Sequence, residues 1–159
     1  SECIAGRTNS EGIQCLYLAS DEETTFHEVR ARDNDHVSVG EFCQVKDLKI
    51  VDLSLFDKIG PFSIPDFDMT WFAINIDIIR KIGNEVAMPM RRFDSVLDYV
   101  PTQYICDYVK HLGYDGIRYK STLVEGGINY AIFDERKFEC KKVKVVHIGN
   151  IQYEWSILS

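Results

Sequence analysis

Three side chains near the start of the chain could do chemistry together: a guanidinium, a phenol ring and a carboxylate. Arg7 lies in a Gly-Arg-Thr-Asn turn, Tyr17 lies in an apolar run, and Glu28 lies in a helical pattern. A guanidinium held in a turn can grip a phosphate through two parallel hydrogen bonds, which Lys does less well. Each residue alone also has an ordinary interpretation: a surface Arg, a packed strand Tyr, and a Glu that extends from an apolar seam to water.

A second group of polar residues lies far along the chain. Ser121 ends an apolar run, a glycine-bearing loop follows, and Asn129 begins the next run. This pattern predicts two polar groups at the edge of a sheet, although an ordinary hairpin with a polar rim gives the same pattern. A serine protease is a poorer interpretation, because Ser121 lacks a Gly-x-Ser-x-Gly setting and no His is placed with it.

The elements that must position these residues are predicted from apolar periodicity and from start and stop signals. We expect a strand over 15–19, a helix capped by Ser20 or Asp21 that runs to about Arg30, and a strand pair over 36–45 and 48–53 joined at Lys46-Asp47. A loop over 56–67 and a break at 89–92 flank a helix that Gly83-Asn84 ends, and a second helix runs from about Thr102 to Gly113. Strands are expected over 116–120, 128–133, 143–148 and 151–158.

The helices in this prediction occupy the middle of the chain and the strands dominate both ends, so the fold class is α+β rather than alternating βαβ. Helical spacing also predicts which side chains face the core. In the first helix, Phe26 and Val29 are expected to turn the face that carries Glu28 towards the core. In the last helix the predicted apolar face consists of Ile105, Tyr108, Val109 and Leu112.

Composition limits the class of protein. The chain has 159 residues, 45% of them hydrophobic, and a formal net charge of −7, which favours one domain and disfavours a nucleic-acid or anionic-membrane surface. The five cysteines are scattered and never spaced as Cys-x-x-Cys. This argues against a disulfide framework and a zinc site, and it suggests a reducing compartment. With no signal peptide or transmembrane run evident, we expect a cytoplasmic location.

Two segments together resemble the RES domain family. The first, "GRTNSEGIQCLYLASDEETTFHEVR", is similar to the family's block of a Gly-Arg-x-Asn turn, a strand and a helix with a Glu. The second, "YICDYVKHLGYDGIRYKSTLVEGGINYAIFD", is similar to its closing block of a helix, a strand, a Ser and a Gly-x-Asn. The resemblance implies a fold like that of bacterial ADP-ribosyltransferase toxins, in which two β-sheets flank a cleft that binds NAD.

The same resemblance implies an activity and a set of residues. Members are toxins that break NAD down by hydrolysis or phosphorolysis, or transfer its ADP-ribose to a protein, and their neutraliser is a helix-turn-helix antitoxin of the Xre type. A non-enzymatic interaction module on the same fold is a further alternative. NAD is then the substrate, and no metal is required. By the family pattern the catalytic residues are Glu28, Ser121 and Arg7, and the NAD-binding residues are Arg7, Asn9, Tyr17, Ser121 and Asn129.

The chain departs from the family pattern in two places. Family members begin with a strand bearing another Arg upstream of the Gly-Arg-x-Asn turn, and this chain starts after that point. We therefore expect residues 1–159 to be a single RES-like domain that forms the C-terminal part of a longer protein. Either Arg7 alone takes the phosphate role, or these residues lack one catalytic element. The segment from about 53 to 98 is longer than the family core requires, so it is expected to be a variable insert.

Overall fold

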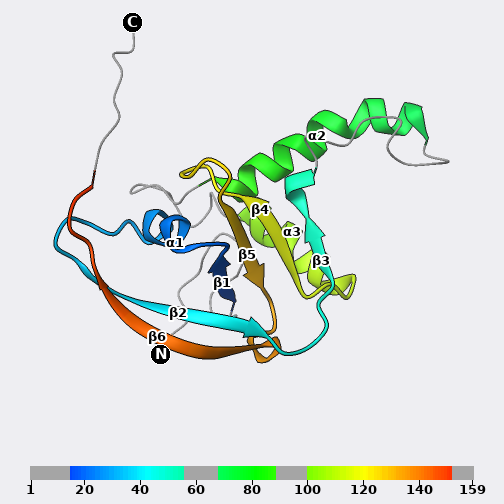
Figure 1. Ribbon diagram of the computed structural model, residues 1–159. Helices are drawn as coiled ribbons and strands as arrows, with labels where there is room; N and C mark the ends of the chain where they lie inside the picture. The colour runs from blue at the N-terminus through cyan, green and yellow to red at the C-terminus, as the bar shows by residue number, and fades with distance from the viewer. Residues whose placement is uncertain (1–14, 56–67, 89–99, 152–159) are drawn as a thin grey trace, which may run out of the picture.

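The computed structural model describes residues 15–55, 68–88 and 100–151. These residues form one mixed sheet, one antiparallel sheet and three α-helices (Figure 1). One sheet has four strands in the order β1-β5-β4-β3, and the other pairs β2 with β6. The elements in chain order are β1 (Leu16–Ala19), α1 (Glu22–Glu28), β2 (His36–Gln44), β3 (Ile50–Asp52), the 3-10 helix η1 (Leu53–Leu55), α2 (Met69–Ala87), α3 (Val100–His111), β4 (Gly116–Lys120), β5 (Ile128–Ile132), the 3-10 helix η3 (Glu135–Lys137) and β6 (Phe138–His147).

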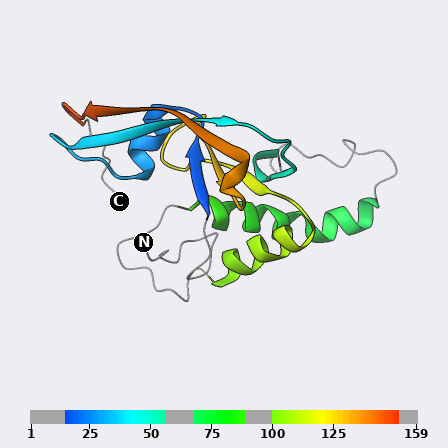
Figure 2. The ribbon, with the colours of Figure 1, turned by 90° about the horizontal axis from the view of Figure 1, so that it is seen from below.

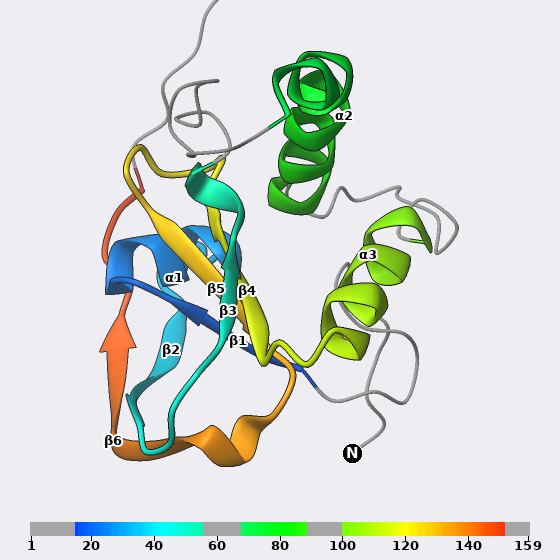
Figure 3. The same ribbon diagram turned by 90° about the vertical axis from the view of Figure 1, so that its right-hand side faces the viewer.

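The four-stranded sheet forms the middle of the molecule. Helices α2 and α3 cover one of its faces, while the β2–β6 pair lies on the other side (Figure 2, Figure 3). The core lies between the sheet and these two helices, and its buried members are Leu53, Val86, Cys106, Val109, Ile117 and Ala131. The predicted α+β class is confirmed.

Close contact between β4 and β5 requires a glycine at the start of β4. A Cβ added at Gly116 would lie 2.5 Å from the carbonyl oxygen of Ala131, which is too close for any side chain. The two strands are antiparallel neighbours, and the directly opposed residues Ile117 and Ala131 are completely buried. The strands predicted over 116–120 and 128–133 are therefore correct, and so is the strand over 15–19.

The predicted pairing of the strands over 36–45 and 48–53 is wrong. Strand β2 pairs antiparallel with β6, from His36 opposite His147 to Gln44 opposite Phe138, whereas β3 pairs in parallel with β4 in the other sheet. Strand β6 is also longer than predicted, because it begins at Phe138 rather than at 143. Neighbouring strands in sequence often pair, but here β3 finds its partner 66 residues away and β2 finds its partner about one hundred residues away. Local patterns carry no such information.

Helix α2 continues past its predicted stop and ends at Ala87, because Gly83 costs an internal helix only about 1 kcal/mol and tertiary packing outweighs it. Helix α3 ends near Gly113 as predicted, and that glycine has a φ of 81°. Its buried residues are Thr102, Cys106 and Val109, whereas Tyr108 and Leu112 are more than half exposed. The face of α3 that packs against the core is thus rotated about the helix axis relative to the predicted face. The loop over 56–67, the break at 89–92 and the strand over 151–158 lie outside the described residues, apart from Ile151.

The core face of α1 also differs from the prediction. Val29 is 58% exposed, and the completely buried residue of α1 is Thr24. The helix has only 7 residues, so it buries one small polar side chain rather than an apolar stripe. Glu28 nevertheless lies at its end, as expected.

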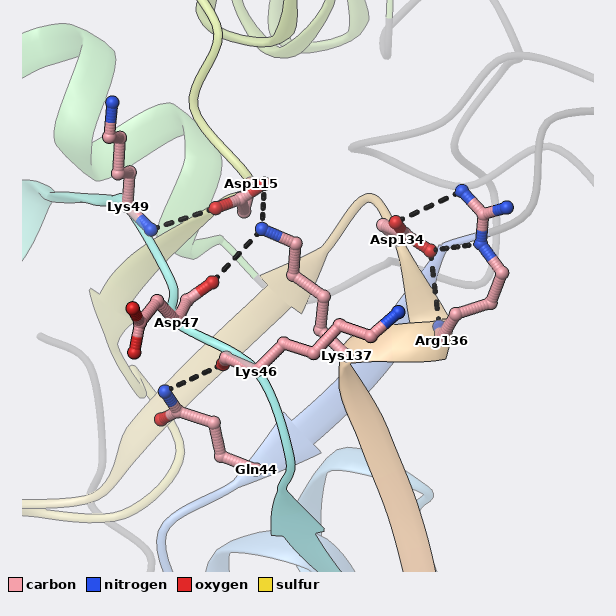
Figure 4. Close-up of polar contacts among 8 residues, drawn as sticks. All are labelled: Gln44, Lys46, Asp47, Lys49, Asp115, Asp134, Arg136 and Lys137. Carbon is pink, nitrogen blue, oxygen red and sulfur yellow. Dashed lines mark hydrogen bonds and ion pairs between the residues drawn. The ribbon is translucent and has the colours of Figure 1, made fainter.

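A polar cluster fastens the end of the four-stranded sheet that lies opposite the β4–β5 loop. Lys137 Nζ lies 2.7 Å from Asp115 Oδ1 and donates to the carbonyl oxygen of Asp47 at 3.0 Å, while the Lys49 backbone N–H donates to Asp115 Oδ2 (Figure 4). The hydrogen bond from Lys137 is the main cause that holds the pKa of Asp115 below its usual value. This cluster joins η3, the β2–β3 connection and the start of β4.

Candidate functional site

Glu28 owes its position to a well-capped short helix. Asp21 precedes α1, and its Oδ1 accepts a hydrogen bond from the Thr24 backbone N–H at 2.7 Å, while its Oδ2 accepts from the Thr24 hydroxyl at 2.9 Å. These bonds satisfy donors that a helix start leaves unpaired. The backbone bond from Thr24 is the largest cause that lowers the pKa of Asp21. The cap therefore stays ionised at neutral pH and holds the helix that ends with Glu28.

The carboxylate of Glu28 meets the two polar residues predicted at the sheet edge. Its Oε1 accepts a hydrogen bond from Ser121 Oγ at 2.9 Å and another from Asn129 Nδ2 at 2.6 Å. These partners lie 93 and 101 residues further along the chain. Both of these hydrogen bonds reach the same carboxylate oxygen, so Oε1 is held from two sides.

The hydroxyl of Ser121 is oriented by its own loop. Its oxygen accepts from the backbone N–H groups of Leu123 at 3.1 Å and Val124 at 3.3 Å. With both acceptor positions used in this way, the hydroxyl proton is directed at Glu28. Ser121 is thus built as a donor that positions the carboxylate or a substrate hydroxyl.

The β4–β5 loop packs directly against α1. A Cβ added at Gly127 would lie 2.6 Å from the Thr24 hydroxyl oxygen and 3.2 Å from Ser121 Cβ. The Ser121 backbone N–H donates to the carbonyl oxygen of Gly127 at 2.8 Å. The Ser20 backbone N–H donates to the Ile128 carbonyl oxygen at 2.8 Å, and the Ile128 backbone N–H donates to Ser20 Oγ at 3.2 Å. This close contact brings Ser121 and Asn129 to Glu28.

Two tyrosines lie on the face of the sheet that carries Asn129. Tyr17 is opposite Ala131 and Tyr119 is opposite Asn129, so all four residues point towards the same face. Tyr17 is on the opposite face from Leu16 and Leu18, as predicted, and its side chain is 47% exposed. Burial strongly raises the pKa of Tyr119, and the nearby Tyr17 and Glu28 raise it further. The Tyr119 phenol therefore keeps its proton at physiological pH.

Tyr119 is a site residue that the sequence prediction missed. It directly precedes Lys120 and Ser121 in "GIRYKS", and strand alternation alone would have placed it on the face of Asn129. The prediction also missed a partly buried ion pair on the opposite face, where Arg118 Nη1 contacts Asp52 Oδ2 at 2.5 Å and Ser54 Oγ at 2.6 Å. Burial works to raise the pKa of Asp52, but hydrogen bonds from Ser54 and Arg118 outweigh it and lower that pKa.

The remaining predicted residues, Arg7 and Asn9, lie outside the described residues, so the structure does not place them. Within residues 15–55, 68–88 and 100–151, no group of three or more His, Cys, Asp or Glu side chains could hold a metal ion. In the same ranges no helix is long and apolar enough to cross a membrane.

The assembled site consists of one carboxylate, two donors fixed on it and an exposed phenol ring beside it. A carboxylate fixed in this way can stabilise positive charge on a bound substrate, or accept a hydrogen bond from a substrate hydroxyl. An exposed aromatic ring can stack on a planar group.

Comparison with known proteins identifies the family of the chain. No curated protein and no solved structure matches the chain. The family model of the RES domain matches residues 2–156, which is nearly the whole chain, and the mixed α+β architecture with two sheets agrees with it. The chain therefore belongs to the RES domain family.

Proposed function

We propose that this protein cleaves the bond between nicotinamide and ribose in NAD. Membership of the RES domain family, which is known from toxin–antitoxin contexts, supports an NAD-related enzymatic role at the level of the family. The observation that carries the finer proposal is the pair of hydrogen bonds from Ser121 and Asn129 to one oxygen of Glu28. They fix one oxygen of this carboxylate, and we propose that the other faces the substrate.

The proposed chemistry depends on charge that develops in the transition state. As the glycosidic C–N bond breaks, its electron pair returns to the nicotinamide nitrogen, which becomes neutral, and positive charge develops on the ribose. A fixed carboxylate stabilises that charge more than it stabilises ground-state NAD, and only such a difference accelerates the reaction. The acceptor oxygen then bonds to the ribose carbon and loses its proton.

Each residue has a part in this proposal. Glu28 faces the ribose, with Oε2 accepting from a ribose hydroxyl, and Ser121 and Asn129 hold the carboxylate in place. Tyr17 stacks on the nicotinamide ring from the face of the sheet that it shares with Asn129. Arg7 and Asn9 are proposed to bind the pyrophosphate.

The acceptor is proposed to be water or phosphate, which gives free ADP-ribose or ADP-ribose-1-phosphate. Transfer to a protein shares the bond-breaking step and differs only in the acceptor, so it is the alternative. As a toxin of this family, the protein is further proposed to be neutralised by a helix-turn-helix antitoxin of the Xre type.

Incubation of the purified chain with NAD tests the proposal, with nicotinamide, ADP-ribose and ADP-ribose-1-phosphate resolved by chromatography. Glu28→Gln keeps the shape of the side chain and removes its charge, so nicotinamide release should fall about 100- to 1,000-fold. Glu23→Gln is the matched control, because Glu23 is an exposed carboxylate at the other end of the same helix. Equal release by the Glu28 variant and the unaltered chain would refute the assignment. Label found on a protein, with little free ADP-ribose, would favour the alternative.

A further inference from the structure

The two-stranded sheet carries a pair of histidines that the proposed cleavage does not use. His36 begins β2 and His147 ends β6, and the two residues are directly opposite each other. Their ring centroids lie 4.9 Å apart, and the ring planes are tilted by 46°. These ends of β2 and β6 lie on the side of the molecule away from α2 and α3 (Figure 2). The pair is therefore separate from the core that those helices form with the four-stranded sheet.

The backbone beside the two histidines brings their side chains close together. The Asn34 N–H donates to the Ile148 carbonyl oxygen at 2.8 Å, and the Ile148 N–H donates to the Asp35 carbonyl oxygen at 2.9 Å. Two residues of one strand thus oppose one of the other, which is a β-bulge, and Asn34 has the positive φ of 66° that such a bulge uses at its first position. Hydrogen-bonded and non-hydrogen-bonded pairs alternate along an antiparallel ladder. The next pair, His36 and His147, is therefore non-hydrogen-bonded, and the side chains of such pairs approach most closely.

Side chains of the same turn fix this end of the sheet further. Asp35 Oδ2 accepts from the Arg32 backbone N–H at 2.7 Å, and Asp33 Oδ1 accepts from the Ile151 backbone N–H at 2.7 Å. The second bond ties the turn before β2 to the segment after β6. The spacing of the two imidazoles is thus set by the fold, and a ligand that needs this spacing binds with a smaller entropy cost.

The spacing fits two imidazoles bound to one metal ion. A metal–nitrogen distance of about 2.0–2.1 Å puts the centroid of each imidazole ring roughly 3.2 Å from the metal. Two such rings at angles between about 90° and 110° have centroids about 4.5–5.2 Å apart, and these angles cover square-planar and tetrahedral sites. The observed 4.9 Å lies within this range. Both side chains are exposed, so an ion can reach them from solvent.

We propose that His36 and His147 together bind a late first-row divalent transition ion, with water at its remaining positions. Imidazole is a preferred ligand of Ni²⁺, Cu²⁺ and Zn²⁺. Structural zinc sites use four protein ligands, so a site with two is an exchangeable surface site rather than a permanent centre. The ion would join β2 to β6 at one end of the sheet. It takes no part in the cleavage of NAD, so the inference is independent of the proposed function.

Calorimetric titration of the full chain, without an affinity tag, with Ni²⁺ tests the site. Ni²⁺ is the probe because the exposed thiols of Cys43 and Cys140 favour zinc and reduced copper. The unaltered chain should bind one ion at this pair. His36→Gln and His147→Gln should each raise the dissociation constant about tenfold or more, because the second imidazole then no longer adds to the first.

His27→Gln on α1 and His111→Gln on α3 are the matched controls. Both residues are exposed histidines on helices, so their variants should bind Ni²⁺ as the unaltered chain does. Ni²⁺ should also raise the Tm of the unaltered chain and of both controls, because an ion that binds only the folded chain stabilises it. This rise should be lost in His36→Gln and in His147→Gln, whose folding in the absence of metal is checked by circular dichroism.

Three results overturn the proposal. The first is the absence of Ni²⁺ binding by the unaltered chain. The second is an effect of only one of the two variants His36→Gln and His147→Gln, which would mean that a single imidazole binds the ion. The third is an equal loss of affinity in the control variants. Nicotinamide release by His36→Gln should equal that of the unaltered chain, so the metal site and the proposed cleavage are tested separately.

Discussion

The two hydrogen bonds to Glu28 predict how much kcat/KM for NAD falls when Asn129 or Ser121 no longer holds the carboxylate. Both residues donate to Glu28 Oε1, at 2.6 Å and 2.9 Å. Asn129→Ala and Ser121→Ala each remove one donor and leave the carboxylate itself in place. If the carboxylate is the catalytic group, each variant should lower kcat/KM for NAD.

The structure sets the size of the two losses. A hydrogen bond to a charged group contributes roughly 1.5–3 kcal/mol, and each 1.4 kcal/mol corresponds to about a factor of ten in rate. Asn129 is only 4% exposed, so water replaces its amide poorly and the loss should lie near the upper end, at about 100-fold. Ser121 is more accessible, and water can partly replace its hydroxyl, so we expect a loss of about tenfold.

The double variant should lose more than the product of the single losses. With either donor present, Oε1 remains anchored, and only the loss of both leaves the carboxylate free to rotate. Residues that share one partner commonly show interaction energies of this kind. Initial rates of nicotinamide release at subsaturating NAD give kcat/KM, and circular dichroism with thermal unfolding controls for folding. A folded Asn129→Ala variant with unchanged kcat/KM, beside an inactive Glu28→Gln, would refute the reasoning.

Asn129→Asp refines the test, because it keeps the shape of the side chain and replaces the donor with a second carboxylate. Two carboxylates this close cannot both ionise easily, so one of them must take up a proton and its pKa rises. The shared proton restores a hydrogen bond to Glu28. Activity of this variant should therefore be very low near pH 8 and should recover as the pH falls towards about 5, while the unaltered chain shows no such recovery. A flat pH profile for the variant would contradict the prediction.

Three further predictions concern the surroundings of the site. Gly127→Ala places a methyl group 2.6 Å from Thr24 Oγ1, so it should destabilise the fold by roughly 1–3 kcal/mol in urea unfolding, whereas Gly149→Ala, with nothing within 4 Å, should not. Tyr17→Ala should raise KM for NAD while Tyr17→Phe retains it, as measured by steady-state kinetics, because stacking needs the ring rather than the hydroxyl. Because the folded-state pKa of Asp115 is lowered chiefly by Lys137, its stabilising effect is present above pH ~4 and disappears as the pH falls below that value; Asp115→Asn should flatten the acid side of a plot of unfolding free energy against pH.

Local signals in the sequence were sufficient for the elements that carry the site. Asp21 before two acidic residues identified the start of α1, and the apolar runs before Ser121 and after Asn129 identified β4 and β5. These signals are local because caps and strand alternation depend on neighbours a few residues apart. The pairing of β2 with β6 was not predictable in this way, because the residues that fix it are about one hundred positions apart.

The meeting of Glu28 with Ser121 and Asn129 could be expected only through the resemblance to the RES domain family. No spacing rule relates residues 93 and 101 positions apart, and each residue alone had an ordinary interpretation. Tyr119 could have been found from strand parity, since it lies opposite Asn129.

The position of Glu28 is set by residues that have no part in the proposed reaction. Thr24 is completely buried, and Gly127 lies so close to it that α1 cannot shift without moving the loop that carries Ser121. Lys144 Nζ holds the other end of the helix through Glu22 Oε1 at 2.5 Å. A helix of 7 residues has little stability of its own, so these tertiary contacts must supply its rigidity. Substitutions at Thr24 or Gly127 should therefore affect both stability and activity, because the same packing determines both.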